Sequence, residues 1–496
     1  MRGSGAKVQN TLARPPINVA AADSNNWAGD QLRSTLWLLA APIIFAFAIT
    51  AFHFDPGKLG LYGFSALFVA FLLLQLRKGP EPLLATIIVY MPLSRLYAAR
   101  IAPGLNGTNL LELFLVAAWL AGAFRNKRKL LSAYPFTRVV TIWMLLAVVS
   151  IFTAISQIGL QPFIWNYTQP LRGFFDQFII FFLFVNLICD KNMARRIIIY
   201  VMLSAAVIYL LGIHEWWGTR YDSSIEKSRL LGPVGQPNDF AALMVYSIAP
   251  FLAYGAYYFP RWKSLRLTPI VLVGLRVLLA AFSRGAYLAF AMELFTVAFF
   301  KSRKFFILVA LILGSIYFFI PALVPNSMKA RIAQTYEDRA VGSSIDKSAE
   351  SRLILWSAAI KMIKSNPILG MGFDQFQRLS PEYTSEPIEA SDNQNFFLYT
   401  ASNMGLPSLI VFFIIIFSAA LRGLYIYRRS AQAIDRIIGL SGLTMVAGLI
   451  GVNMFGTHVI DTAVDGFFWI HLAVMAHLLR DSSQQNSLTQ HAKRSI

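Results

Sequence analysis

Arg284 is the residue whose type and place most directly suggest chemistry. It lies in Phe282-Ser283-Arg284-Gly285, a turn between two apolar stretches. A guanidinium beside the hydrocarbon of a bilayer is costly, so it tends to mark a function or a specific partner. Its planar fork suits a phosphate bidentately, and Gly285 would let the backbone pass close to another group. Snorkelling of Arg284 to the lipid headgroups is the structural alternative.

Two further arginines could join Arg284 in binding an anion. Arg352 begins a segment with helical periodicity, and Arg229 precedes a Leu-Leu-Gly-Pro turn. The topology predicted from the distribution of Lys and Arg places all three on the same side of the membrane. This placement allows a cationic pocket at the outer boundary, although the sequence does not show that the three side chains converge.

Other ionisable groups have simpler interpretations. Arg172 lies four residues before Asp176, a spacing that favours an ion pair within one helix. Asp461 and Asp465 share a helical face near His458, where they could handle protons, with pairing or helix capping as the alternative. The six histidines form no HxxH or HxxxH pair on the outer side, so we expect no metal and no cofactor.

The elements that position these residues are expected to be membrane helices. The chain of 496 residues has 56% hydrophobic but only 14% charged residues, whereas soluble domains have about 25% charged residues. Runs of roughly 20 apolar residues recur between 34 and 480, each long enough to cross a core about 30 Å thick. We predict an all-α, polytopic membrane bundle of 12–14 transmembrane helices at 34–480. A disordered cytoplasmic tail (1–33) would precede it and a cytoplasmic tail (481–496) would follow it.

Fourteen candidate spans can be drawn along the bundle. They lie near 34–52, 59–76, 81–98, 109–124, 138–156, 170–189, 194–213, 238–258, 267–282, 284–300, 303–321, 396–419, 437–454 and 464–479.

Positive charge predicts the orientation of these spans. Alternate connections are rich in Lys and Arg, whereas 157–169 and 455–463 contain neither. Since cytoplasmic loops collect bases, both termini of this inner (plasma) membrane protein are predicted to be cytoplasmic. The formal net charge of +19 then needs no nucleic acid, and no basic patch interleaved with aromatics suggests one. The basic connections lie near 77–78, 125–129, 191–196, 261–266, 301–304 and 422–436.

Two long connections, 214–237 and 322–395, fall on the outer side in this topology. The second is much longer than a structureless loop usually is, which suggests a function. Within it Leu353, Trp356, Ile360 and Ile363 recur at helical spacing. This stripe predicts an amphipathic helix along the outer membrane boundary. A helix packed on the bundle is the alternative.

Four segments together resemble the O-antigen ligase and polymerase-related family of bacterial integral-membrane glycosyltransferases. Their order and spacing carry the resemblance, which covers roughly residues 200–480. The segments are Arg229 through Leu-Leu-Gly-Pro to Asn238-Asp239; Ser283-Arg284-Gly285-Ala286; Glu350-Ser351-Arg352 through Trp356 to Asn366-Pro-Ile-Leu-Gly-Met-Gly372 and Phe376; and Asn395 through Leu398 to Gly405.

The resemblance implies a GT-C-like helical enzyme that takes an undecaprenyl-diphosphate-linked glycan at the periplasmic face. It would pass that glycan to an acceptor hydroxyl without a metal. The family's arginines correspond to Arg284 and Arg352, where the resemblance implies contact with the donor diphosphate. Arg229 is the third candidate. Fixed positive charge there would stabilise an anionic leaving group.

The sequence departs from the family at the expected general base. Ligases place a His-Asn pair eleven residues before the glycine that is here Gly405, and this chain has Gln394 and Asn395 there. Glutamine cannot titrate, so it cannot act as a base. Asp392 is the nearest replacement, with His214, His458 or Asp461 as more distant options; Gln394 could also only orient the acceptor. The candidate catalytic residues are thus Asp392, Gln394 and Asn395.

The first functional hypothesis is a polymerase of exopolysaccharide or O-antigen type that joins lipid-linked repeats. The alternatives are a ligase to lipid A core and a bicarbonate-type transporter or flippase. A transporter should carry ionisable groups near mid-membrane, whereas the distinctive residues here lie at the outer edge. The expected partners are an undecaprenyl-diphosphate-linked oligosaccharide, membrane lipid, a flippase and a chain-length regulator, with no nucleic acid.

Overall fold

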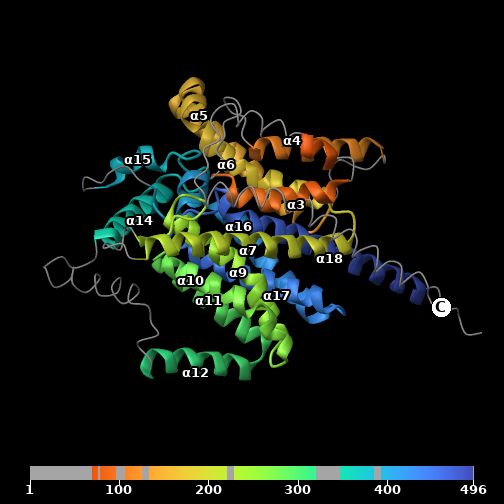
Figure 1. The fold of residues 1–496 in the computed structure, drawn as a ribbon. Helices are drawn as coiled ribbons and strands as arrows, with labels where there is room; N and C mark the ends of the chain where they lie inside the picture. The colour runs from red at the N-terminus through yellow and green to blue at the C-terminus, as the bar shows by residue number, and fades with distance from the viewer. Residues whose placement is uncertain are drawn as a thin grey trace, which may run out of the picture.

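A computed structural model describes residues 70–75, 79–95, 107–125, 133–220, 228–319, 347–384 and 392–494. The predicted tail 1–33, the span 34–52, most of the span 59–76 and the first part of the loop 322–395 lie outside the described residues. Within the described ranges the regular elements are helices, with no strand (Figure 1). They are α3 (Pro80–Tyr90), η1 (Met91–Leu93), α4 (Gly107–Arg125), α5 (Thr137–Ile158), α6 (Leu160–Leu187), α7 (Lys191–Thr219), α9 (Pro237–Tyr258), η2 (Trp262–Leu267), α10 (Thr268–Ala280), α11 (Arg284–Lys301), α12 (Arg303–Phe319), α14 (Lys347–Ser365), α15 (Phe376–Tyr383), α16 (Phe396–Arg429), α17 (Ala433–Asn453) and α18 (Thr462–Arg494).

Eight of the described helices are long and apolar enough to cross a bilayer: α4, α5, α6, α7, α9, α16, α17 and α18. They make the protein a multi-pass helical membrane protein, which confirms the predicted fold class. α10 and α12 are apolar but shorter, with 13 and 17 residues. The predicted total of 12–14 spans stays a prediction, because two of its members fall largely outside the described residues.

The centre of the bundle is α17, which packs against α16, α11 and α9, while α18 packs against α6, α9 and α7. Apolar burial does not drive helix association inside lipid, so close backbone approach and polar contacts matter more. A Cβ on Gly439 would lie 2.6 Å from the carbonyl oxygen of Gly423, so these glycines bring α16 and α17 together. The Trp143 indole donates to Ser408 Oγ at 3.0 Å and joins α5 to α16.

One predicted loop is helical in the structure. The connection expected at 157–169 is reduced to Gly159, whose φ of 85° reverses the chain directly from α5 into α6. A positive φ is inexpensive for glycine. α6 therefore begins at Leu160, ten residues before the predicted span 170–189, and includes Pro170.

The helix predicted from the 353–363 stripe is confirmed as α14, but its buried face is different. Leu355, Ala358, Ala359 and Met362 are buried against α15 and α16. The predicted stripe instead leaves Leu353 50% and Ile360 45% exposed. α14 thus packs on the bundle through one face and shows a second apolar face outward. Figure 1 shows α14 and α15 together at one end of the long helices.

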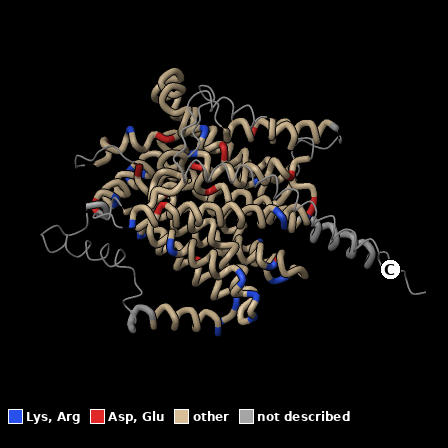
Figure 2. The backbone as a smooth tube through the Cα atoms, in the orientation of Figure 1, with Lys and Arg blue, Asp and Glu red and all other residues tan. Residues whose placement is uncertain are grey.

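Charge is distributed unevenly over the bundle. Long stretches carry no charged residue, and basic residues gather where α11 joins α12 (Figure 2). Far from α14, Arg196 donates to both Glu81 oxygens at 2.6 and 2.7 Å. Arg195 binds Asp435 in the same way, at 2.7 and 2.9 Å. These two ion pairs connect the first turns of α3, α7 and α17.

Candidate active site

Arg229, Arg284 and Arg352 line one cavity at the α14 end of the bundle. The sequence did not show whether these three side chains come together, and the structure shows that they do. The same cavity is lined by Asn238 at the start of α9 and by His458, just before α18. Its wall thus comes from loops far apart in the sequence, all at one end of the helices.

The loop before α9 holds Arg229 in place. Arg229 Nη2 donates to Asn238 Oδ1 at 2.9 Å, and its Nε donates to the Ala281 carbonyl at 3.3 Å. The carboxylate of Glu215, on α7, accepts the backbone N–H groups of Leu231 and Gly232 at 2.8 and 3.0 Å. The Leu-Leu-Gly-Pro turn is thereby fixed against α7, and Arg229 is directed to the cavity by neutral oxygens.

Arg284 is the first residue of α11. An α-helix N-terminus carries unpaired N–H groups and a partial positive charge, which favours anions. The predicted close approach at Gly285 is confirmed: a Cβ there would lie 3.0 Å from Phe455 Cβ. Arg284 and the N-terminus of α11 therefore both add positive potential to the wall of the cavity.

Arg352, on α14, is held by the loop that precedes α16. Its Nε donates to Gln394 Oε1 at 2.7 Å, and the nearby Trp356 indole donates to the Asn393 carbonyl at 2.9 Å. Gln394 has a φ of 50°, a left-handed conformation that few non-glycine residues adopt. Gln394 thus contacts a cavity arginine, and an acceptor-orienting role for it stays a prediction.

Asp392 and Asn395 both have structural contacts. The Thr457 hydroxyl donates to Asp392 Oδ2, and burial raises the pKa of the Asp392 carboxyl, while that hydrogen bond opposes the rise. Asn395 caps α16, where its Oδ1 accepts from the backbone of Phe397 and Leu398 at 3.0 and 3.1 Å. Such a cap satisfies otherwise unpaired N–H groups of a helix start.

The Asn366-to-Gly372 run docks on a kink in α16. Gly405 has a φ of 82° inside this helix, and a Cβ there would lie 2.0 Å from the Ile368 carbonyl oxygen. Leu406 N donates to the Pro367 carbonyl at 2.8 Å, and Met371 N donates to the Ser402 carbonyl at 2.7 Å. The run therefore fixes α14, and with it Arg352, relative to α16.

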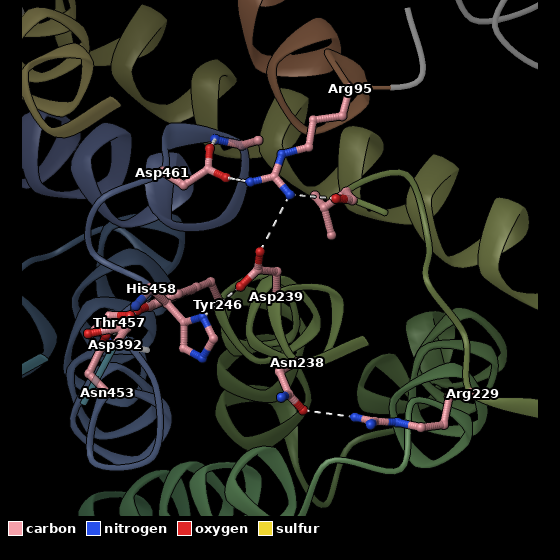
Figure 3. A network of polar contacts seen from close by, with 12 residues as sticks. Arg95, Arg229, Asn238, Asp239, Tyr246, Asp392, Asn453, Thr457, His458 and Asp461 are labelled. Atoms are coloured by element: carbon pink, nitrogen blue, oxygen red, sulfur yellow. Dashed lines mark hydrogen bonds and ion pairs between the residues drawn. The ribbon is translucent and has the colours of Figure 1, made fainter. Parts of the chain in front are cut away.

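The structure adds Asp239 and Arg95 to the site. His458 Nδ1 lies 3.0 Å from Asp239 Oδ1, and Arg95 Nη1 lies 3.4 Å from Asp239 Oδ2. Arg95 also pairs with Asp461 and donates to the Val234 carbonyl at 2.6 Å (Figure 3). Asp239 was visible only as the end of the motif that begins at Arg229, and Arg95 only as a charge inside a predicted span.

The predicted proton-handling trio is divided between separate contacts. Asp461 caps α18 through Ala463 N at 3.0 Å and pairs with Arg95; burial raises the pKa of Asp461 and Arg95 lowers it. Asp465 accepts the Trp469 indole N–H at 2.8 Å inside the bundle. Pairing and capping thus account for Asp461, whereas Asp465 hydrogen-bonds to an indole and His458 contacts Asp239. The predicted ion pair within α6 is confirmed at 3.5 Å.

Comparison with known proteins gives one family match. Residues 269–413 match the family model described as O-Antigen ligase. This segment contains Arg284, Arg352 and the run that docks on Gly405. No curated protein gives a significant match to the chain.

Proposed function

We propose that this membrane protein is a glycosyltransferase, because residues 269–413 match the family model described as O-Antigen ligase. Its donor is a glycan on undecaprenyl diphosphate, and its first candidate activity is the joining of lipid-linked repeat units into a surface polysaccharide. The reaction takes place at the periplasmic face and needs no metal.

The observation that carries the proposal is the shared cavity of Arg229, Arg284 and Arg352. In glycosyl transfer, the acceptor oxygen bonds to the anomeric carbon while the bond from that carbon to the diphosphate breaks. Negative charge then grows on the leaving diphosphate. Fixed guanidinium groups and a helix N-terminus stabilise that charge without reorganising during the reaction.

The proposed orientation has the cavity end outside and both termini inside. Two features support it: the basic connection between α11 and α12 (Figure 2) follows the end of α11 opposite to Arg284, and cytoplasmic loops are the ones that collect Lys and Arg. The inner membrane of a bacterium follows from a lipid-linked donor. Contacts with a flippase and a chain-length regulator belong to the same proposal.

Ligation to lipid A core is the second candidate, and the description of the matched family favours it. The residue at the position of the family's histidine favours polymerisation, since Gln394 contacts Arg352 and cannot take a proton. The family match gives no support to a transporter.

The test is a set of arginine variants in a deletion strain, read by a gel of surface glycans and lipid-linked intermediates. Arg284→Ala and Arg352→Ala are each expected to abolish long polymer while the protein still inserts. Arg378→Ala is the matched control, because Arg378 binds Gln157 and Gln375 outside the cavity. Normal polymer in both cavity variants would refute the diphosphate pocket.

The same gel separates the candidates. In the deletion strain, single repeats without long polymer indicate a polymerase. Full-length polymer that accumulates on the lipid carrier indicates a ligase, and unchanged glycans contradict both.

A further inference from the structure

We propose that His458 is the general base that takes the proton from the acceptor hydroxyl, and that Asp239 positions its ring. The inference rests on the proposed glycosyl transfer. It assigns the base to a residue outside the family segment 269–413, replacing the histidine that this chain lacks at Gln394.

His458 lies in the wall of the arginine cavity, so it is close to where the donor diphosphate would bind. Its backbone is fixed as well, because His458 N donates to Asn453 Oδ1 at 3.0 Å. Asn453 in turn donates to the Tyr246 hydroxyl at 2.8 Å. The loop between α17 and α18 is thereby anchored to α9, which limits how the imidazole can move.

Asp239 determines which ring nitrogen can act. The carboxylate lies 3.0 Å from His458 Nδ1, and Arg95 stabilises its charged form from the other side. A hydrogen bond from Nδ1–H to Asp239 leaves the lone pair on Nε2. Figure 3 shows this second nitrogen pointing away from Asp239 and toward the side where Asn238 and Arg229 lie.

Gly456 provides space for Nε2. A Cβ at this position would lie only 2.1 Å from His458 Nε2, so any side chain would displace the ring. The neighbouring backbone has a second task, since the Gly456 carbonyl accepts from Phe396 N at 3.0 Å at the start of α16. The glycine thus lets the imidazole lie against the backbone of Gly456, which is itself hydrogen-bonded to the start of α16.

The other candidates fit the role less well. Burial raises the pKa of the Asp392 carboxyl, but the Thr457 hydroxyl and the backbone N–H groups of Asn393 and Gln394 already hydrogen-bond to this carboxylate and oppose the rise. Neither Asp392 nor His214 is among the residues that line the cavity. His458 is the histidine that lines it.

In the transfer step, His458 Nε2 takes the proton of the acceptor hydroxyl as the acceptor oxygen bonds to the anomeric carbon. The bond from that carbon to the diphosphate breaks at the same time. The electron pair of the broken bond stays on the diphosphate, beside Arg284 and Arg352. The imidazolium, stabilised by Asp239, then releases its proton to water, which restores the starting state.

The experiment uses the full chain and separates binding from turnover. Turnover is read as surface polymer in the deletion strain, and binding as the affinity of purified protein for undecaprenyl diphosphate. His458→Gln is expected to lose at least 100-fold of turnover with unchanged binding. His214→Gln, the matched control, should change neither.

Asp239→Asn tests the positioning role. We expect a smaller loss of turnover than in His458→Gln, with binding again unchanged, because the base remains but its tautomer and orientation are no longer fixed. In Gly456→Ala the ring is displaced, so turnover should also fall. A purely structural role of His458 would reduce binding and folded yield together, and that result would overturn the proposal.

Two further results would also overturn it. Normal polymer in His458→Gln excludes His458, and abolished turnover in Asp392→Asn with normal turnover in His458→Gln assigns the base to Asp392. Failure of the proposed function looks different, because Arg284→Ala and Arg352→Ala would then keep their affinity for undecaprenyl diphosphate.

Discussion

Two arginines at one end of the bundle are held by carboxylates, whereas two of the arginines that line the cavity contact neutral oxygens. At the end away from α14, Arg196 and Arg195 each donate twice to a carboxylate, Glu81 and Asp435. At the cavity end, Arg352 donates to the neutral amide of Gln394, and Arg229 to a neutral amide and a backbone carbonyl. The first two arginines are held by carboxylates, and the second two make at least some of their hydrogen bonds to neutral oxygens.

The type of partner indicates what role an arginine has in a membrane protein. A bidentate carboxylate partner satisfies both the charge and the hydrogen bonds, so such a pair joins helices. A hydrogen bond to a neutral partner holds the geometry of a guanidinium without itself neutralising the charge. Gln394 illustrates the second case, since it is uncharged at the position where the family has a titratable residue.

Gln394→Glu should give Arg352 a carboxylate partner, like those of Arg195 and Arg196. A carboxylate 2.7 Å from Arg352 Nε would neutralise the guanidinium, and we expect about a hundredfold loss of transfer, equivalent to about 2.7 kcal/mol. Gln394→Ala is the control, because it removes the contact and keeps the charge; its loss should be roughly tenfold. Equal activity of the two variants would contradict the charge argument. Polymer yield per folded protein is the measurement.

Glu81→Ala tests the opposite end. It leaves Arg196 without its bidentate partner where both side chains are mostly buried, so unfolding free energy should fall by about 3 kcal/mol. Transfer per folded molecule should stay within about twofold, since charge at this end has no part in the reaction. Thermal stability in detergent and the glycan gel measure the two effects.

The double variant Glu81→Leu with Arg196→Met sharpens this test. Replacing both partners removes the uncompensated charge, so most of the lost stability should return. A transfer defect in either variant would show that the two ends are functionally coupled.

The smallest expected effect concerns pH at the cavity end. Burial raises the pKa of the Asp374 carboxyl to about 6, above its unfolded value of about 4. The folded protein therefore favours the protonated form, and this contribution is complete below about pH 4 and is lost as pH rises through about 6. The melting temperature should fall slightly over that window. Asp374→Asn should flatten the fall, and an unchanged pH profile in this variant would refute the assignment.

Much of the fold and part of the site followed from the sequence. Hydropathy predicted the bundle, and charge predicted the turns with Arg229, Arg284 and Arg352 on one side, but only the structure shows that the three side chains line one cavity. Helical spacing predicted α14. Its buried face could not be chosen, because the 353–363 stripe and the Leu355–Met362 face are both apolar and only the neighbouring α15 and α16 decide between them.

The contacts that complete the site could not be predicted. Asp239 and His458 are 219 positions apart, and no periodicity within one helix relates them. The role of Gln394 depends on its backbone φ of 50°, which the residue type does not predict. Gly159 was equally unpredictable, since a glycine between apolar runs fits a long loop as well as a single-residue reversal.

The contact between Arg95 and Asp461 has a consequence for how the protein is made. Arg95 follows η1, whereas Asp461 directly precedes α18, so the two are synthesised 366 positions apart. His458 belongs to the same late segment. The wall of the arginine cavity can therefore be complete only after His458 has been synthesised, late in the chain.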